Sequence, residues 1–165
     1  VPWLTFANII GPLIFLGYAI GRLGCFLVGD DYGIPSTLPW AMSFPKGIPP
    51  TTTHVFSDLY PWIDISSYES GLIRVHPTQL YEAMICFLLF FIMWKYRKSS
   101  TIKDLLFFLY LFLAGIERFF IEFLRTNQKY VFEILSGAQL ISLGMIFIGL
   151  YFIINPITEA KPESA

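Results

Sequence analysis

Four long apolar segments alternate with polar segments along this chain. They predict helices over 3–28, 77–96, 105–125 and 134–154, each close to the ~20 residues that a membrane-spanning helix needs. Long unbroken apolar runs such as Ile85–Met93 are typical of the last three segments. One such run also occurs in buried helices of soluble proteins, but four in one short chain favour a bilayer. The pattern predicts an all-α polytopic membrane protein with about four transmembrane helices.

The segment between the first two helices, residues 29–76, is rich in proline. It contains Pro35, Pro39, Pro45, Pro49, Pro50 and Pro61. Proline removes a backbone N–H and clashes with the preceding helical turn, so this density argues against a helix and against a long regular strand. We predict a long loop within a single membrane domain, 1–165, whose polar tail is 155–165.

Basic residues set the predicted orientation. The connection between the second and third helices carries Lys95, Arg97, Lys98 and Lys103. By the positive-inside rule this connection is cytoplasmic, which also places the C-terminal tail in the cytoplasm and the 29–76 loop outside. The outer helix ends then carry the unusual polar residues, and we place the functional site there.

The composition excludes several classes of protein. Hydrophobic residues make up 55% of the chain and charged residues 14%, against about 25% charged in a typical soluble domain. This excludes disorder, and the net charge of −1 gives no reason to expect a nucleic acid partner. Cys25 and Cys86 are too few for a disulfide framework or a cysteine-based metal site. The adjacent carboxylates Asp30 and Asp31 are weak evidence for a cation, so no metal and no cofactor are expected.

The third predicted helix carries charges at membrane depth. Arg118, Glu122 and Arg125 are spaced i, i+4, i+7 and share one face, whereas Glu117 points about 100° away. An arginine there costs about 2.5–3.5 kcal/mol on insertion scales and needs a partner or a purpose. Two interpretations stay open: an internal ion-pair network, or an anion site with a positive surplus. The planar fork of arginine suits phosphate.

The first helix contributes one more arginine, Arg22, among the glycines Gly17, Gly21 and Gly24. Arg22 joins the anion site if it faces the same cavity. Either the helix breaks near these glycines or Arg22 sits inside the membrane, and the pair Gly17 and Gly21 also permits another helix to pack closely.

The second helix opens on His76-Pro-Thr-Gln-Leu-Tyr-Glu82. Pro77 suits the first helical position, where its missing N–H is harmless. Gln79 and Glu82 are spaced i, i+3 and are expected to face inward together. These two side chains either form hydrogen bonds that stabilise the start of the helix where it enters the membrane, or belong to the functional site.

Five motifs, in this order, resemble the prolipoprotein diacylglyceryl transferase family. They are Gly21–Gly33 (GRLGCFLVGDDYG), Leu38–Trp40 (LPW), His76–Glu82 (HPTQLYE), Glu117–Arg125 (ERFFIEFLR) and Ser136–Leu140 (SGAQL). The resemblance runs from about Gly11 to Tyr151. It implies a multi-pass enzyme of the bacterial plasma (inner) membrane that transfers a diacylglyceryl group from phosphatidylglycerol to the lipobox cysteine thiol of preprolipoproteins. The products are a thioether and glycerol phosphate, and the site opens to the outer side.

The resemblance also implies partners and residue roles. The partners are phosphatidylglycerol, preprolipoprotein signal peptides and membrane lipid. Arg22 and Arg118 match the family's essential arginines and are the expected catalytic residues. The expected substrate-binding residues are Arg22, Asp30, Gly33, His76, Gln79, Glu82, Arg118, Glu122 and Arg125.

The chain departs from the family pattern in three ways. Cys25 stands where the family commonly has Asn, and Asp30 where it usually has Glu. The His-Gly-Gly-Leu segment, whose histidine is a proposed base, belongs to an N-terminal part that is missing here, so the chain resembles the C-terminal two-thirds of the enzyme. His76 is a base candidate by residue type only. The alternatives are a non-catalytic lipid-binding relative and a small-anion membrane transporter.

Overall fold

The computed structural model of the chain describes residues 3–99, 102, 104–129 and 135–157. Its regular elements are α1 (Trp3–Val28), α2 (Thr53–Leu59), α3 (Thr78–Tyr96), α4 (Leu106–Ile121), the 3-10 turn η1 (Glu122–Leu124) and α5 (Gly137–Ile154). The all-helical prediction is confirmed for these described residues. Three helices, α1, α3 and α5, are long and apolar enough to cross a membrane. Predictions for Lys103, residue 134 and most of the 155–165 tail fall outside the described residues.

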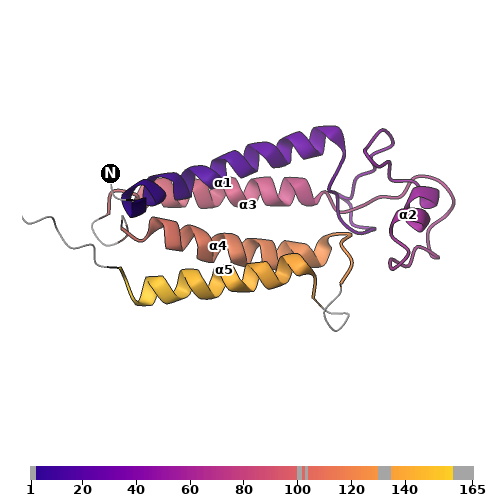
Figure 1. Cartoon of the computed structure of the whole chain (residues 1–165). Coiled ribbons are helices and arrows are strands. Elements are labelled where there is room, and N and C mark those ends of the chain that lie inside the picture. The colour runs from indigo at the N-terminus through magenta and orange to yellow at the C-terminus, as the bar shows by residue number, and fades with distance from the viewer. Residues whose placement is uncertain (1–2, 100–101, 103, 130–134, 158–165) are drawn as a thin grey trace, which may run out of the picture.

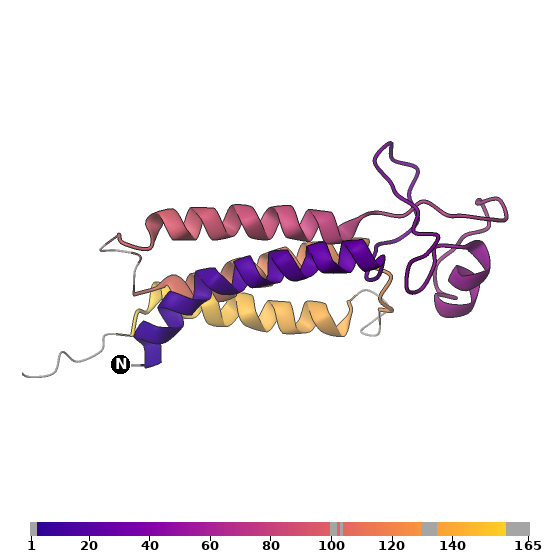
Figure 2. The same cartoon turned by 90° about the horizontal axis from the view of Figure 1, so that it is seen from above.

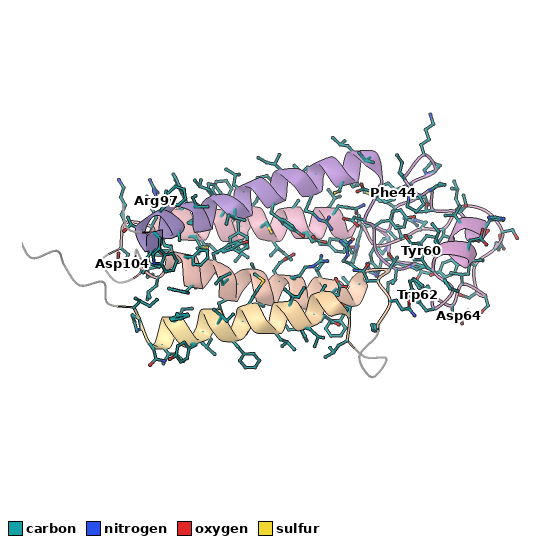
Figure 3. The ribbon with its side chains drawn as sticks, in the orientation of Figure 1. Phe44, Tyr60, Trp62, Asp64, Arg97 and Asp104 are labelled. Carbon is teal, nitrogen blue, oxygen red and sulfur yellow. The ribbon has the colours of Figure 1, made fainter. Side chains whose placement is uncertain are left out.

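The four long helices lie side by side and alternate in direction (Figure 1). α1 packs against both α3 and α4, and α5 packs against α4, an order that can be followed in the turned view of Figure 2. The 29–76 segment lies at one end of the bundle. Figure 3 places Phe44, Tyr60 and Trp62 at that end and Arg97 and Asp104 at the opposite end. Segments far apart in the sequence therefore meet at the end with the long loop.

Contacts from α1 fix the start of α4. The Asn8 Oδ1 atom accepts a hydrogen bond from the Phe107 N–H at 2.8 Å. That N–H belongs to the first helical turn, where backbone donors have no partner within the helix. Gly11 lies opposite, and a Cβ atom there would come within 3.3 Å of the Leu106 carbonyl oxygen. A polar cap and a close approach therefore hold α4 against α1.

Glycines also let α4 and α5 approach each other closely, but not the glycines that the sequence indicated. A Cβ atom on Gly115 would lie 2.8 Å from the Ser142 carbonyl oxygen, and one on Gly149 would lie 2.7 Å from the Phe112 nitrogen. Gly17 and Gly21, predicted to allow helix packing, have no atom within 4 Å of such a Cβ among the described residues. The described helices therefore do not use this pair for close packing, because the rotation of α1 turns these glycines away from its described neighbours.

The 29–76 loop contains a helix, which its prolines argued against. α2 occupies the stretch without proline between Pro50 and Pro61, and Thr52 caps it by accepting a hydrogen bond from the Val55 N–H at 3.4 Å. Beside α2, aromatic and β-branched side chains form a small core around Tyr32, Phe56, Ile73 and Val75. Between its described residues the loop makes isolated β-bridges, such as that of Pro35 with Val75. It is thus a packed unit at the end of the bundle.

Gly33 joins this loop to the helices. Its N–H donates to the His76 carbonyl oxygen at 2.9 Å, and the next N–H, of Ile34, donates to the Leu124 carbonyl oxygen at 2.8 Å. A Cβ atom on Gly33 would clash with the Leu124 carbonyl oxygen and lie 2.7 Å from the Thr78 methyl carbon. A glycine is required here because three chain segments meet at the position.

We expect Gly33→Ala to destabilise the fold by about 1–3 kcal/mol, the usual cost of overpacking. The measurement is the thermal unfolding midpoint in detergent. Gly144→Ala is the matched control, because no atom of the described residues lies within 4 Å of a Cβ at Gly144. An unchanged midpoint for Gly33→Ala would show that the loop accommodates the added methyl group without losing stability.

Candidate functional site

A cavity of about 380 Å³ opens between the helices, and its charged wall lies toward the loop end of the bundle. The polar and charged side chains that line it are Tyr18, Arg22, Asp31, Tyr110, Glu117, Arg118 and Arg125. The apolar side chains that line it include Ile14, Phe15, Ala114 and Met145. The cavity therefore has a charged wall and an apolar wall.

Glu82 is the centre of the charged cluster. Its side chain is fully buried. One carboxylate oxygen accepts from Arg22 Nη2 at 2.6 Å, and the other accepts from the Tyr18 hydroxyl at 2.6 Å. Arg125 Nη1 lies 3.4 Å away and Arg118 Nη1 lies 3.9 Å away. One buried carboxylate on α3 thus holds groups from α1, α4 and the segment after η1.

Asp31 forms a second bridge, from the loop. Its two carboxylate oxygens accept from Arg22 Nη1 at 2.8 Å and from Arg125 Nη2 at 2.6 Å. Its backbone has a φ of 54°, which is uncommon for a residue other than glycine. Burial acts to raise the pKa of this carboxyl, but the Arg22 hydrogen bond and the Arg125 charge outweigh it and hold the pKa below the ordinary range. Asp31 therefore stays ionised at neutral pH.

Glu122 connects the end of α4 to the start of α5. One oxygen accepts from Asn127 Nδ2 at 2.7 Å and from the Ser136 hydroxyl at 2.8 Å, and the other lies 3.2 Å from Arg118 Nη2. Ser136 in turn caps α5 through a reciprocal capping box with Gln139. The ion-pair cluster and the helix cap therefore support each other.

The cluster is balanced in charge, which corrects the expected positive surplus. Three guanidinium groups, Arg22, Arg118 and Arg125, pair with three carboxylates. Two of these carboxylates, Asp31 and Glu82, come from segments other than the helix that carries Arg118. A charge count made from the sequence of that helix alone therefore does not include Asp31 or Glu82.

Arg118 is the least engaged of the three arginines. Its side chain is 28% exposed, against 8% for Arg22 and 8% for Arg125. It lies within ion-pair distance of Glu82 and Glu122 but makes no hydrogen bond in the part of the chain that the structure describes. Its donors are therefore available to a ligand in the cavity.

The other predicted site residues shape the surroundings. Gln79 Nε2 donates to the Asp30 carbonyl oxygen at 2.5 Å, so it fixes the turn that presents Asp31. His76 does not line the cavity. Its Nδ1 lies 3.4 Å from the Tyr81 hydroxyl beside an apolar groove, and burial lowers the pKa of its ring. Gly33 supports the loop as described above.

Three residues of the cavity were missed or placed elsewhere by the sequence analysis. Tyr18 lies one helical turn before Arg22, a spacing that is visible in the sequence. Asp31 was considered only as a weak cation ligand. Glu117 was assigned to another face, yet it is buried and lines the cavity beside Arg118. No local signal identifies Asp31 or Glu117, because both contacts depend on neighbouring segments.

One group of described residues has the spacing of a metal site. Ligand atoms of Cys25, Asp30 and Asp31 lie within 4.8 Å of one another. Arg22 Nη1 lies 3.6 Å from the Cys25 sulfur and 2.8 Å from Asp31, so a positive charge already occupies this position. The expectation of no metal stays a prediction. Cys25 and Cys86 are both free thiols.

Comparison with known proteins identifies relatives of the whole described bundle. The family model for prolipoprotein diacylglyceryl transferase matches residues 1–155. The phosphatidylglycerol–prolipoprotein diacylglyceryl transferase of Clostridium tetani is 33% identical over 90% of this chain and 52% of its own length. Those of Finegoldia magna and of Clostridium botulinum strain Hall are 32% and 34% identical, over 90% and 96% of this chain and 49% and 56% of their own lengths. No solved structure matches significantly.

The chain spans about half the length of the curated relatives it matches. This is less than the two-thirds that the sequence analysis expected.

Proposed function

The chain belongs to the prolipoprotein diacylglyceryl transferase family, and from this premise we propose that it transfers a diacylglyceryl group from phosphatidylglycerol to the lipobox cysteine thiol of a preprolipoprotein. The thiol becomes a thioether, and glycerol phosphate leaves. The names of the relatives include both substrates, phosphatidylglycerol and prolipoprotein. The observation that carries the proposal is the cavity in which three arginines meet apolar helix walls.

The two walls of the cavity suit the two parts of a phospholipid. A phosphate presents two of its oxygens to the planar fork of an arginine and accepts two hydrogen bonds from it. The acyl chains need an apolar surface, which Phe15, Ala114 and Met145 offer. Arg118 is the expected first ligand of the phosphate because its donors are not used by the cluster.

The reaction itself needs positive charge at the leaving group. A thiolate attacks the glyceryl carbon, and the C–O bond to phosphate breaks. The phosphate then goes from one negative charge to nearly two. Groups that bind this growing charge stabilise the transition state more than the ground state and so raise the rate. Arg118 and Arg22 have this role in the proposal.

Asp31 competes with the phosphate. Its carboxylate is bound by Arg22 and Arg125 in the way that a phosphate would be, and its side chain is 45% exposed, so it is the carboxylate of the cluster that can leave. Because its pKa is lowered, this competition persists at neutral pH. Substrate phosphate would replace Asp31 on at least one arginine.

We therefore expect Asp31→Asn to lower the KM for phosphatidylglycerol by about fivefold, the effect of removing about 1 kcal/mol of exposed ion pairing. The measurement is the initial rate of transfer as a function of phosphatidylglycerol in mixed micelles. Asp104→Asn, at the opposite end of the bundle, is the matched control (Figure 3). A raised KM in Asp31→Asn would mean that Asp31 positions the arginines instead of competing for them.

The position in the membrane is part of the proposal. Four helices, α1, α3, α4 with η1, and α5, would span the bacterial plasma (inner) membrane. Lys95, Arg97 and Lys98 lie at the end opposite the cavity, so the positive-inside rule favours a cytoplasmic α3–α4 connection and an outer loop at 29–76. The cavity would then open toward the outer side, where preprolipoprotein signal peptides present the lipobox.

The test uses the protein made from its complete reading frame, in phosphatidylglycerol liposomes with a lipobox peptide. Mass spectrometry is expected to find one added diacylglyceryl group on the peptide. No adduct from folded protein that binds phosphatidylglycerol would favour a non-catalytic lipid-binding relative. No adduct together with anion flux across the liposomes would favour a transporter.

A further inference from the structure

Among the carboxyl groups that line the cavity, Glu117 is the one that the ion-pair cluster of the described residues leaves out. Asp31, Glu82 and Glu122 each lie within 4.0 Å of an arginine. Among the described residues Glu117 has no such partner, although it is only 8% exposed and its Oε1 atom is buried without a hydrogen bond. An ionisable group inside a membrane-spanning helix is costly, and a functional role is the default explanation.

Glu117 lies in the cavity where the proposed function places the reacting groups. It lines the same cavity as Arg22, Arg118 and Arg125. It also lines an apolar groove of about 340 Å³ between α3 and α4, beside Leu89 and Leu113. Glu117 and Arg118 are consecutive and diverge by about 100° around the helix, so one cavity holds a carboxyl group and a guanidinium group on different sides.

The neighbours of Glu117 exclude two other roles. The charged groups that act on it are Glu82 from α3, Arg22 from α1, and Arg118 and Arg125 from its own segment. The other titratable groups along the cavity are Tyr18, Asp31, Cys86 and Tyr110. The first excluded role is binding of the substrate phosphate, because a carboxylate repels that group. The second is binding of a substrate cation, because neither the thiol nor the phosphate carries a positive charge. The role that remains for Glu117 is to accept a proton.

Building on the proposed transferase reaction, we propose that Glu117, instead of the upstream histidine that the resemblance implies, is the general base that accepts the proton of the lipobox thiol. The S–H proton moves to the Glu117 carboxylate as the sulfur forms its bond to the glyceryl carbon. The C–O bond breaks, and its electron pair leaves with the phosphate of glycerol phosphate. The proton then returns to water or to the released phosphate.

This assignment keeps the charge of the cavity constant. A free thiol has a pKa of about 8.5 and is mostly protonated at neutral pH, so the reaction needs a base. The proton neutralises Glu117 as the phosphate gains its second negative charge. The three arginines therefore face the same total charge before and after the transfer, without an uncompensated charge in the membrane.

The experiment compares two lipobox peptides, one with cysteine and one with selenocysteine. A selenol ionises at a lower pH than a thiol and reaches the site already deprotonated. With the protein from its complete reading frame, we expect Glu117→Gln to lower kcat for the cysteine peptide by about 10²–10⁴-fold. The KM for phosphatidylglycerol should stay within about threefold. The ratio of selenocysteine to cysteine rates should rise at least about tenfold over the wild-type ratio, because the ionised nucleophile needs no base.

Each outcome decides the assignment. An unchanged kcat overturns it, and so does a lowered kcat with an unchanged rate ratio, because a merely structural role slows both peptides equally. Glu69→Gln, in the exposed outer loop, is the matched control and should leave both rates unchanged. If Glu117→Gln does not accumulate in the membrane, Glu117→Ala, which also removes the carboxylate, takes its place and the same rise in ratio is required. Wild-type protein that modifies neither peptide would instead overturn the proposed function.

Discussion

Replacing Arg118 by alanine is expected to lower kcat for diacylglyceryl transfer by about 10²–10³-fold, the usual effect of removing one donor that stabilises a developing anion. The reason is that the three arginines differ in how many of their donors are already bound to carboxylates. Arg22 and Arg125 are bound to Glu82 and Asp31 by hydrogen bonds, whereas Arg118 keeps its donors for the cavity. The loss should therefore fall on kcat more than on the folded state.

The measurement is the initial rate of adduct formation at saturating phosphatidylglycerol, together with the thermal unfolding midpoint. Arg118→Lys keeps the charge but not the planar fork, and we expect it to recover only part of the rate. Arg97→Ala, at the opposite end of the bundle, is the matched control. A full rate in Arg118→Ala would return Arg118 to a purely structural ion-pair role.

Replacing Glu82 by glutamine is expected to destabilise the protein by about 3 kcal/mol, at the low end of the range for breaking a buried ion pair. The substitution keeps the shape of the side chain but leaves three arginines facing two carboxylates. Arg22, held at 2.6 Å, loses its shortest ion pair. The measurement is chemical unfolding in detergent, with Glu69→Gln as the control.

A double-mutant cycle separates this charge effect from packing. In Glu82→Gln/Arg22→Gln the charge balance returns, so the double variant should lose less stability than the sum of the two single variants. Strict additivity of the two losses would show that Glu82 and Arg22 do not act as a pair.

The long helices of the fold follow from the sequence. Apolar length predicted segments 3–28 and 77–96, and α1 and α3 occupy Trp3–Val28 and Thr78–Tyr96. Helical periodicity put Arg118 and Glu122 on one face, and they form an ion pair at 3.2 Å. It also turned Gln79 and Glu82 inward, where both are fully buried. These features depend on residues within one or two turns of each other.

The composition of the site depended on the tertiary structure. Glu82 and Arg22 are 60 residues apart, and only the packing of α1 on α3 brings them together. The inward side of Glu117 and the close approach at Gly115, in place of Gly17, depend on how each helix is rotated about its axis. The sequence does not encode that rotation plainly, because lipid-facing and core-facing side chains of a membrane helix are equally apolar. Length and spacing therefore determine where the helices lie and which charges share a face, whereas contacts between helices decide which face is the interior.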